Sequence, residues 1–156
     1  MDLHPDCAPL EFLLGTWVGE GVGGYPTIDD FPFRQELVFS HTGQPFLSYA
    51  SQTWTVDDGR PLAAETGFWR PRSQGAVEVL LSHATGISEV YVGEITGKKI
   101  ELTTDLVART ESAQEVTAGH RLYGLIEGGE LAYAYDMAAF GYELQPHVSA
   151  RLNRTE

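Results

Sequence analysis

The sequence predicts an all-β fold: an antiparallel up-and-down β-barrel of about ten strands, with a short helical plug at the N-terminus. Apolar and polar residues alternate with period 2 over most of the chain, as in strands that have one buried face. Glycine-containing turns separate these runs, and a meander of this length closes on itself because closure removes exposed strand edges. A barrel of about ten strands is wide enough to enclose a ligand cavity.

The alternation of apolar and polar residues places the strands along the chain. It is clearest in 33–41, 76–83 and 99–107, where apolar residues fall mainly on alternate positions, with Leu80 as an exception. Further strands are expected at 15–23, 45–56, 62–71, 87–96, 114–126, 130–139 and 145–153. Together these runs supply about ten strands.

Short turns are expected between most of these strands. Asp58-Gly59, Gly97-Lys98 and Gly128-Gly129 fall between strand runs and predict hairpins, because glycine takes a positive φ without a clash at Cβ. A longer loop is expected over 24–32, where two prolines and a pair of aspartates interrupt the alternation.

The clearest helical signal lies at the N-terminus. Residues 6–14 predict one or two helical turns, with Asp6 as the N-cap and Gly15 ending the helix. We expect this segment to plug one end of the barrel. It contains Cys7, the one cysteine of the chain, so an internal disulfide is excluded and Cys7 is expected to be a small structural residue.

Length and charge narrow the classes of function. A chain of 156 residues with 42% hydrophobic residues suits a single globular domain over 1–156. Its 22 acidic and 10 basic residues give a net charge of −12, which disfavours nucleic acid and anionic membrane surfaces as partners. The N-terminus lacks the basic and apolar regions of a signal peptide and no apolar run could span a membrane, so a cytoplasmic location is expected.

The first expected strand carries a distinctive motif, Gly-Thr-Trp-Val-Gly-Glu-Gly at 15–21. A tryptophan flanked by glycines can close a barrel end while the backbone bends around it. This G-x-W pattern resembles the calycins, the superfamily of lipocalins and fatty-acid-binding proteins. The fuller G-x-W-x-G-x-G form is similar to the nitrobindins, a family of ferric-haem β-barrels. The motif indicates a fold and contributes no catalytic group.

Further segments extend the resemblance to nitrobindins over almost the whole chain. They lie at 25–28, 65–70, 85–90, 115–117 and 147–152. The sequence Glu-Thr-Gly-Phe-Trp-Arg at 65–70 is similar to the family's E-[ST]-G-[YF]-x-R segment. The sequence His-Val-Ser-Ala-Arg-Leu at 147–152 is similar to its H-[LV]-[SA]-A-x-L strand, whose histidine is the axial ligand of haem iron.

The resemblance therefore implies that His147 binds the iron of a ferric haem b and is the residue on which catalysis depends. Spacing alone does not single it out. His147 shares a strand face with Ser149 and Arg151, and this pattern favours a side chain that faces solvent. His4 is expected to be disordered or superficial, and strand-surface or hydrogen-bonded positions are expected for His41 and His120.

The opposite wall of the expected pocket departs from the family pattern. Several family members carry a distal histidine at the position of Ala63, which offers only a methyl group. His83 continues the inward series of its strand, and two readings stay open. It either donates to a bound ligand or water, or it is a buried histidine bonded to a neighbouring strand.

Four more residues belong to the pocket by resemblance. Leu62 and Met137 match apolar positions on the haem face, and Thr27 lies in the loop near the pocket. Gln114 stands where close relatives have a lysine that could pair with a haem propionate. The amide keeps a hydrogen-bond donor but loses the charge, which puts this propionate contact in doubt.

The resemblance implies a ferric haem b protein that binds nitric oxide and isomerises peroxynitrite to nitrate, as a monomer or a homodimer. The alternative is a non-enzymatic, calycin-like carrier of an apolar small ligand, with haem absent or incidental. No zinc-protease, Cys-x-x-Cys or phosphate-loop motif offers another chemistry.

Overall fold

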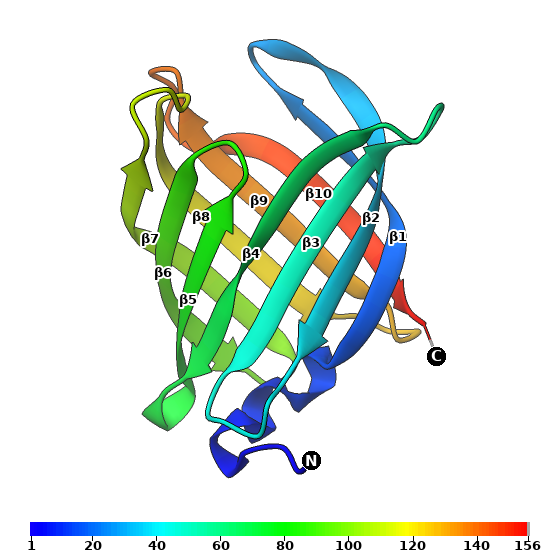
Figure 1. Cartoon of the computed structure of the whole chain (residues 1–156), viewed down its shortest axis with the longest axis vertical. Coiled ribbons are helices and arrows are strands. Elements are labelled where there is room, and N and C mark those ends of the chain that lie inside the picture. The colour runs from blue at the N-terminus through cyan, green and yellow to red at the C-terminus, as the bar shows by residue number, and fades with distance from the viewer. Residues whose placement is uncertain (156) are drawn as a thin grey trace.

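The computed structural model describes residues 1–155, which form a closed antiparallel barrel (Figure 1). The strands are β1 (Gly15–Tyr25), β2 (Ile28–Ser40), β3 (Leu47–Thr55), β4 (Pro61–Pro71), β5 (Ala76–His83), β6 (Ile87–Thr96), β7 (Lys99–Arg109), β8 (Val116–Leu125), β9 (Leu131–Ala139) and β10 (Gln145–Arg154). Each strand pairs with its neighbours along the chain, and β1 closes the barrel against β10. The ten-stranded up-and-down barrel predicted from the sequence is confirmed.

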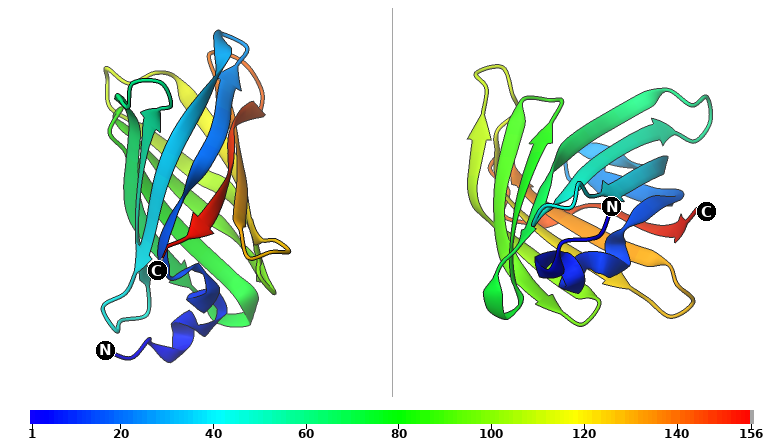
Figure 2. Two further views of the ribbon diagram at one scale, coloured as in Figure 1. Left: turned by 90° about the vertical axis from the view of Figure 1, so that its right-hand side faces the viewer. Right: turned by 60° about the horizontal axis from the view of Figure 1, so that its bottom comes forward.

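A 3₁₀ helix, η1 (Pro5–Leu13), covers one end of the barrel (Figure 2). Its residues Cys7, Leu10 and Leu13 are fully buried. The indole Nε1 of Trp17 donates a hydrogen bond of 2.8 Å to the carbonyl oxygen of Leu13, which joins η1 to the first strand. The expected plug is therefore confirmed. Neither η1 nor any other helix within residues 1–155 has the length and apolar character needed to cross a membrane.

Two local predictions are wrong. The N-cap of η1 is His4 and not Asp6, because the Nδ1 atom of His4 accepts the backbone N–H of Asp6. The expected loop over 24–32 is instead the end of β1, a two-residue turn at Pro26-Thr27 and the start of β2. This hairpin extends beyond the rim of the barrel, so residues 28–30 are exposed and polar side chains are tolerated within a strand (Figure 1).

The predicted glycine turns are confirmed. Gly59 and Gly97 have φ values of 69° and 60°, and the connection between β8 and β9 contains Gly128 and Gly129 with φ values of 93° and 89°. Side chains with a Cβ atom rarely adopt this left-handed region. The hairpins therefore depend on glycine at these positions.

The half of the barrel interior next to η1 is filled by aromatic packing. Phe39 and Trp69 lie edge to face with ring centroids 5.2 Å apart, and Trp69 meets Tyr123 in the same way at 5.0 Å. All three side chains are buried. These ring contacts fill this half of the interior and leave space for a cavity towards the opposite end.

A buried ion cluster crosses the interior beside this packing. Arg121 on β8 donates to both carboxylate oxygens of Glu65 on β4, at 3.0 and 2.9 Å. It also donates to Glu89 on β6 at 3.1 Å and to the hydroxyl of Tyr91 at 3.0 Å. His83 on β5 bonds to Glu89 as well. These five residues are called the Arg121 cluster below.

Both carboxylates of the Arg121 cluster stay ionised despite their burial. Burial alone would raise the pKa of Glu89, but the charge of Arg121 and the hydrogen bond from His83 lower that pKa to about 2. Burial alone would raise the pKa of Glu65 as well, but Arg121, through its charge and its hydrogen bonds, and His83 together lower it. Removing the guanidinium would leave two unpaired charges in the interior, which is costly.

Replacing Arg121 with methionine should therefore lower the free energy of unfolding by roughly 3–5 kcal/mol. Chemical denaturation of the apoprotein, followed by tryptophan fluorescence, measures this change. Arg151→Met, on an exposed position of β10, is the matched control and should change stability by less than about 0.5 kcal/mol. A loss below about 1 kcal/mol for Arg121→Met would show that the ion cluster does not stabilise the barrel.

Acid should remove the contribution of Glu89 to stability. Its pKa is lower in the folded chain, so this contribution is complete above the ordinary pKa of 4.5 and is lost as the pH falls towards about 2. The stability difference between wild type and Glu89→Gln should shrink by roughly 3 kcal/mol between about pH 6 and about pH 2. Comparing the two proteins cancels the repulsion among other acidic residues. A difference that stays constant with pH would contradict this expectation.

Candidate functional site

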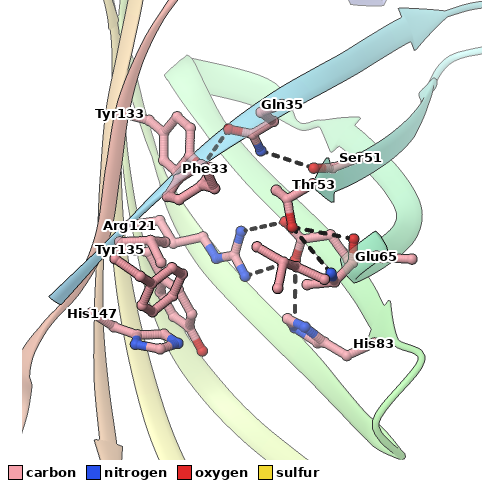
Figure 3. Close-up of a pocket in the computed structure, with 15 residues that line it drawn as sticks. Phe33, Gln35, Ser51, Thr53, Glu65, His83, Arg121, Tyr133, Tyr135 and His147 are labelled. Carbon is pink, nitrogen blue, oxygen red and sulfur yellow. Dashed lines mark hydrogen bonds and ion pairs between the residues drawn. The ribbon is translucent and has the colours of Figure 1, made fainter. Parts of the chain in front are cut away.

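A cavity of about 280 Å³ lies at the end of the barrel away from η1. Figure 3 shows side chains that line it. Its walls are largely apolar and include Phe31, Phe33 and Leu62. Figure 3 places His147 of β10 and His83 of β5 on opposite sides of this space. An apolar cavity with a few converging polar groups is typical of a site for a small organic ligand or cofactor.

A β-bulge turns His147 into this cavity. In the pairing of β10 with β9, Pro146 lies opposite Asp136 and Val148 lies opposite Tyr135, so His147 is the extra, unpaired residue. A bulge re-aims the side chain it carries and breaks the two-residue alternation. Both His147 and Val148 therefore line the cavity. The solvent-facing orientation that strict alternation favours for His147 is wrong for this physical reason.

The orientation of the His147 ring is set by the backbone of β1. Its Nδ1 atom lies 3.0 Å from the carbonyl oxygen of Gly24. A carbonyl can only accept, so Nδ1 carries the proton and the lone pair stays on Nε2. Gly24 itself lies at a break in the register between β1 and β2, between Gly23 and Tyr25. Irregularities in two adjacent strands thus form one half of the site together.

Two tyrosines hold the His147 ring from the sides. Tyr25 and Tyr135 each meet it edge to face with ring centroids 5.7 Å away. The Tyr25 hydroxyl donates to the carbonyl of Met137 at 2.8 Å and accepts from the amide of Ala139 at 2.9 Å. Burial in these surroundings lowers the pKa of His147, although the Gly24 carbonyl opposes this effect. The imidazole is therefore neutral near pH 7, the form that binds a metal.

Tyr135 also connects His147 to the Arg121 cluster. The Arg121 guanidinium carbon lies 4.1 Å from the centroid of the Tyr135 ring, within the range of a cation–π interaction. The Tyr135 hydroxyl donates to Glu89 at 3.0 Å. The side chain beside His147 is thus fixed by buried charges on β6 and β8.

The wall opposite His147 contains Leu62, Ala63 and His83. The Nε2 atom of His83 lies 2.5 Å from Glu89 and 3.5 Å from Glu65. His83 lines the cavity, as the first hypothesis for this residue requires, and it also bonds to a neighbouring strand, as the second requires. Ala63 adds no polar atom of its side chain to this wall.

The trio Glu65, His83 and Glu89 has ligand atoms within 4.8 Å of one another, a spacing that suits a metal ion. Their oxygens are already engaged. Glu89 accepts from His83 and Arg121 at one oxygen, and from Tyr91 and Tyr135 at the other, at 2.7 and 3.0 Å. Arg121 occupies both oxygens of Glu65. The trio is thus better described as part of a hydrogen-bonded ion cluster than as a metal centre.

Three of the sequence-predicted site residues meet at the cavity: Leu62, His83 and His147. Thr27 lies in the exposed turn between β1 and β2, and Gln114 is exposed in the connection before β8. Neither lines the cavity.

Met137 packs beside Tyr135 in a second buried group and likewise does not line the cavity. The roles of Thr27, Gln114 and Met137 as haem contacts stay predictions. The other histidines bond locally: His4 caps η1, the Nδ1 of His41 accepts from Gly43, and His120 pairs with Glu101 on the outer face at 2.8 Å.

Sequence reasoning missed the Arg121 cluster, although a signal was present. Each charged residue of the cluster occupies an inward position of its strand, and the residues two positions before and after it are apolar or glycine. This holds for Glu65, Glu89 and Arg121. A charge at such a position must be paired inside the barrel. Two negative charges and one positive charge on different strands were therefore candidates for a buried ion cluster.

Comparisons with known proteins agree with this geometry. Residues 6–154 match the family model described as THAP4-like, heme-binding beta-barrel domain. A protein of a Nocardioides species named peroxynitrite isomerase is 56% identical, over 98% of this chain and 95% of its own length. A ferric nitrobindin-like protein of Thermobifida fusca is 44% identical, over 99% of this chain and 97% of its own length.

A solved structure gives the same result. The crystal structure of Rv2717c from M. tuberculosis superimposes with a TM-score of 0.92 at 45% sequence identity, covering 99% of this chain and 100% of that one. The match of the family model spans nearly all of the chain, and the relatives are similar over almost their whole length. This chain therefore belongs to the family of THAP4-like, haem-binding β-barrel domains, the nitrobindin family.

Proposed function

We propose that this protein holds ferric haem b through His147 and isomerises peroxynitrite to nitrate, with nitric oxide as a further ligand. The observation that carries the proposal is the position of His147, a neutral imidazole whose Nδ1 faces Gly24 and whose Nε2 is left free at an apolar cavity. The names of the relatives, peroxynitrite isomerase and ferric nitrobindin-like protein, support the same activity. The cytoplasm is the expected location, as the sequence suggests.

The residues present fit a haem. A haem needs one neutral imidazole held in orientation by a second hydrogen bond, and apolar walls for the macrocycle. His147 with the Gly24 carbonyl meets the first need, and Phe31, Phe33 and Leu62 meet the second. Thr27, Gln114 and Met137 are proposed as additional contacts on the strength of the family resemblance.

When bound, ferric haem supplies a Lewis-acidic iron at which peroxynitrite can rearrange. The isomerisation changes neither the number of electrons nor the number of protons, so it requires no reductase. The role of the protein is to position the cofactor and to exclude bulk water. His147 would hold the cofactor, Tyr25 and Tyr135 would keep the imidazole ring of His147 from turning, and apolar side chains such as buried Phe33 would keep bulk water from the reacting atoms.

His147→Ala should weaken binding of hemin by at least roughly 10- to 100-fold, because the ligand to iron is lost. Titration of the apoprotein with hemin, followed by the Soret band, measures this affinity. His120→Ala is the matched control, since His120 is the histidine that pairs with Glu101 on the outer face. A Soret band unchanged by His147→Ala would contradict the assignment of the ligand.

Peroxynitrite decay should be faster with the hemin-loaded protein than with the same concentration of free hemin, and nitrate should be the product. Stopped-flow absorbance and nitrate analysis measure the two quantities. His147→Ala, mixed with hemin, should return the rate to that of free hemin. If the wild-type rate equals that of free hemin, the enzymatic activity is refuted while the haem site stands. If hemin forms no one-to-one complex, haem binding is refuted and the alternative, a carrier of another apolar ligand, is favoured.

A further inference from the structure

The wall of the cavity opposite His147 offers one ionisable ring, that of His83 (Figure 3). Its side chain is 20% exposed and that of its partner Glu89 is completely buried. The ring can therefore contact a ligand that occupies the cavity.

One nitrogen of the His83 ring is already committed. Its Nε2 bonds to Glu89 at 2.5 Å, and Glu89 is itself held by Arg121, Tyr91 and Tyr135. A carboxylate accepts, so Nε2 carries a proton in either charge state of the ring. The nitrogen left for cavity contents is therefore Nδ1, which forms no hydrogen bond within residues 1–155.

The other polar groups of the cavity are largely engaged with one another. Gln35 donates to the hydroxyl of Ser51 at 2.8 Å and accepts from the hydroxyl of Tyr133 at 2.6 Å. The hydroxyl of Thr53 accepts the amide of Ala63 at 3.0 Å. Among the ring nitrogens at the cavity, those without a hydrogen-bond partner in the described part of the chain are Nε2 of His147 and Nδ1 of His83.

The charges around His83 are unequal. Glu65 on β4 and Glu89 on β6 are ionised, Arg121 on β8 carries one positive charge, and the hydroxyls of Tyr91 and Tyr135 are neutral donors to Glu89. The cluster thus has one negative charge in excess. With Nε2–H directed at Glu89, the ring donates from Nδ1 when both of its nitrogens carry a proton.

We propose that His83 stabilises an anionic ligand at the haem by donating a hydrogen bond from Nδ1, while Glu89 holds the ring through Nε2. The inference rests on the proposed function, because it requires haem at His147. It assigns to β5 the polar contribution that the methyl group of Ala63 cannot make. Small anions that accept hydrogen bonds, such as fluoride or peroxynitrite, are the class of ligand that this arrangement favours.

Ligand binding to the hemin-loaded protein tests the inference without measuring activity. Fluoride is an anion that accepts hydrogen bonds, and imidazole is a neutral ligand of the same iron. His83→Leu should weaken fluoride binding roughly tenfold or more, the size expected for one charge-assisted hydrogen bond, and should leave imidazole affinity within about threefold. His120→Leu, the matched control on the outer face, should change neither affinity.

A conservative variant separates binding from folding. His83→Gln keeps an amide that can donate to Glu89, so it should preserve the fold and give a fluoride affinity between those of wild type and His83→Leu. The Fe–F stretching frequency of the wild-type fluoride complex should also change in D₂O, because an exchangeable proton is bonded to the fluoride. This change should be smaller in His83→Gln.

The outcomes are distinct. Unchanged fluoride affinity in His83→Leu, with a normal Soret band, overturns this inference and leaves the proposed function intact. An equal loss of fluoride and imidazole binding overturns it as well, because His83 would then only shape the pocket. A wild-type Fe–F frequency that is the same in H₂O and D₂O overturns it without any variant. Failure of the wild-type protein to bind hemin refutes the proposed function and this inference together.

Discussion

Arg121 is the residue around which the interior of this barrel is organised. It lies on β8, yet its hydrogen bonds reach carboxylates on β4 and β6. Its guanidinium also stacks on Tyr135. A single buried cation thereby joins strands that share no backbone pairing, and it lies between the aromatic packing near η1 and the open cavity. Since buried charges tolerate only good geometry, the strands around Arg121 have little freedom to shift.

This constraint extends to both sides of the cavity. Tyr135 contacts His147 on one side, and Glu89 holds His83 on the other. The side chains that hold the two histidines, Tyr135 and Glu89, both contact the guanidinium of Arg121. The family membership and the neutral, oriented His147 support a haem site, and the charge cluster explains why this site can be rigid although it is built on strands that end at an open rim.

Much of the fold could be predicted from the sequence, because strand alternation and glycine turns are local signals. The extent of β1 and β2 could not, since residues 28–30 at the start of β2 are all exposed and give no alternation. His147 was singled out by resemblance alone. The Arg121 cluster was missed because its pairing joins β4, β6 and β8, and no local pattern tells which inward charges will meet across a barrel.

The bulge at His147 has a consequence for how such proteins are compared and altered. The imidazole faces inward because β10 contains one residue more than β9 at this point. Deleting Pro146 would restore regular pairing with His147 opposite Asp136, a position of the outer face, and would turn the ring towards solvent with the histidine still present in the sequence. The site is therefore specified by the number of residues in the strand as well as by their identity. An alignment that keeps the histidine but places a gap directly before it does not keep the inward orientation of the ring.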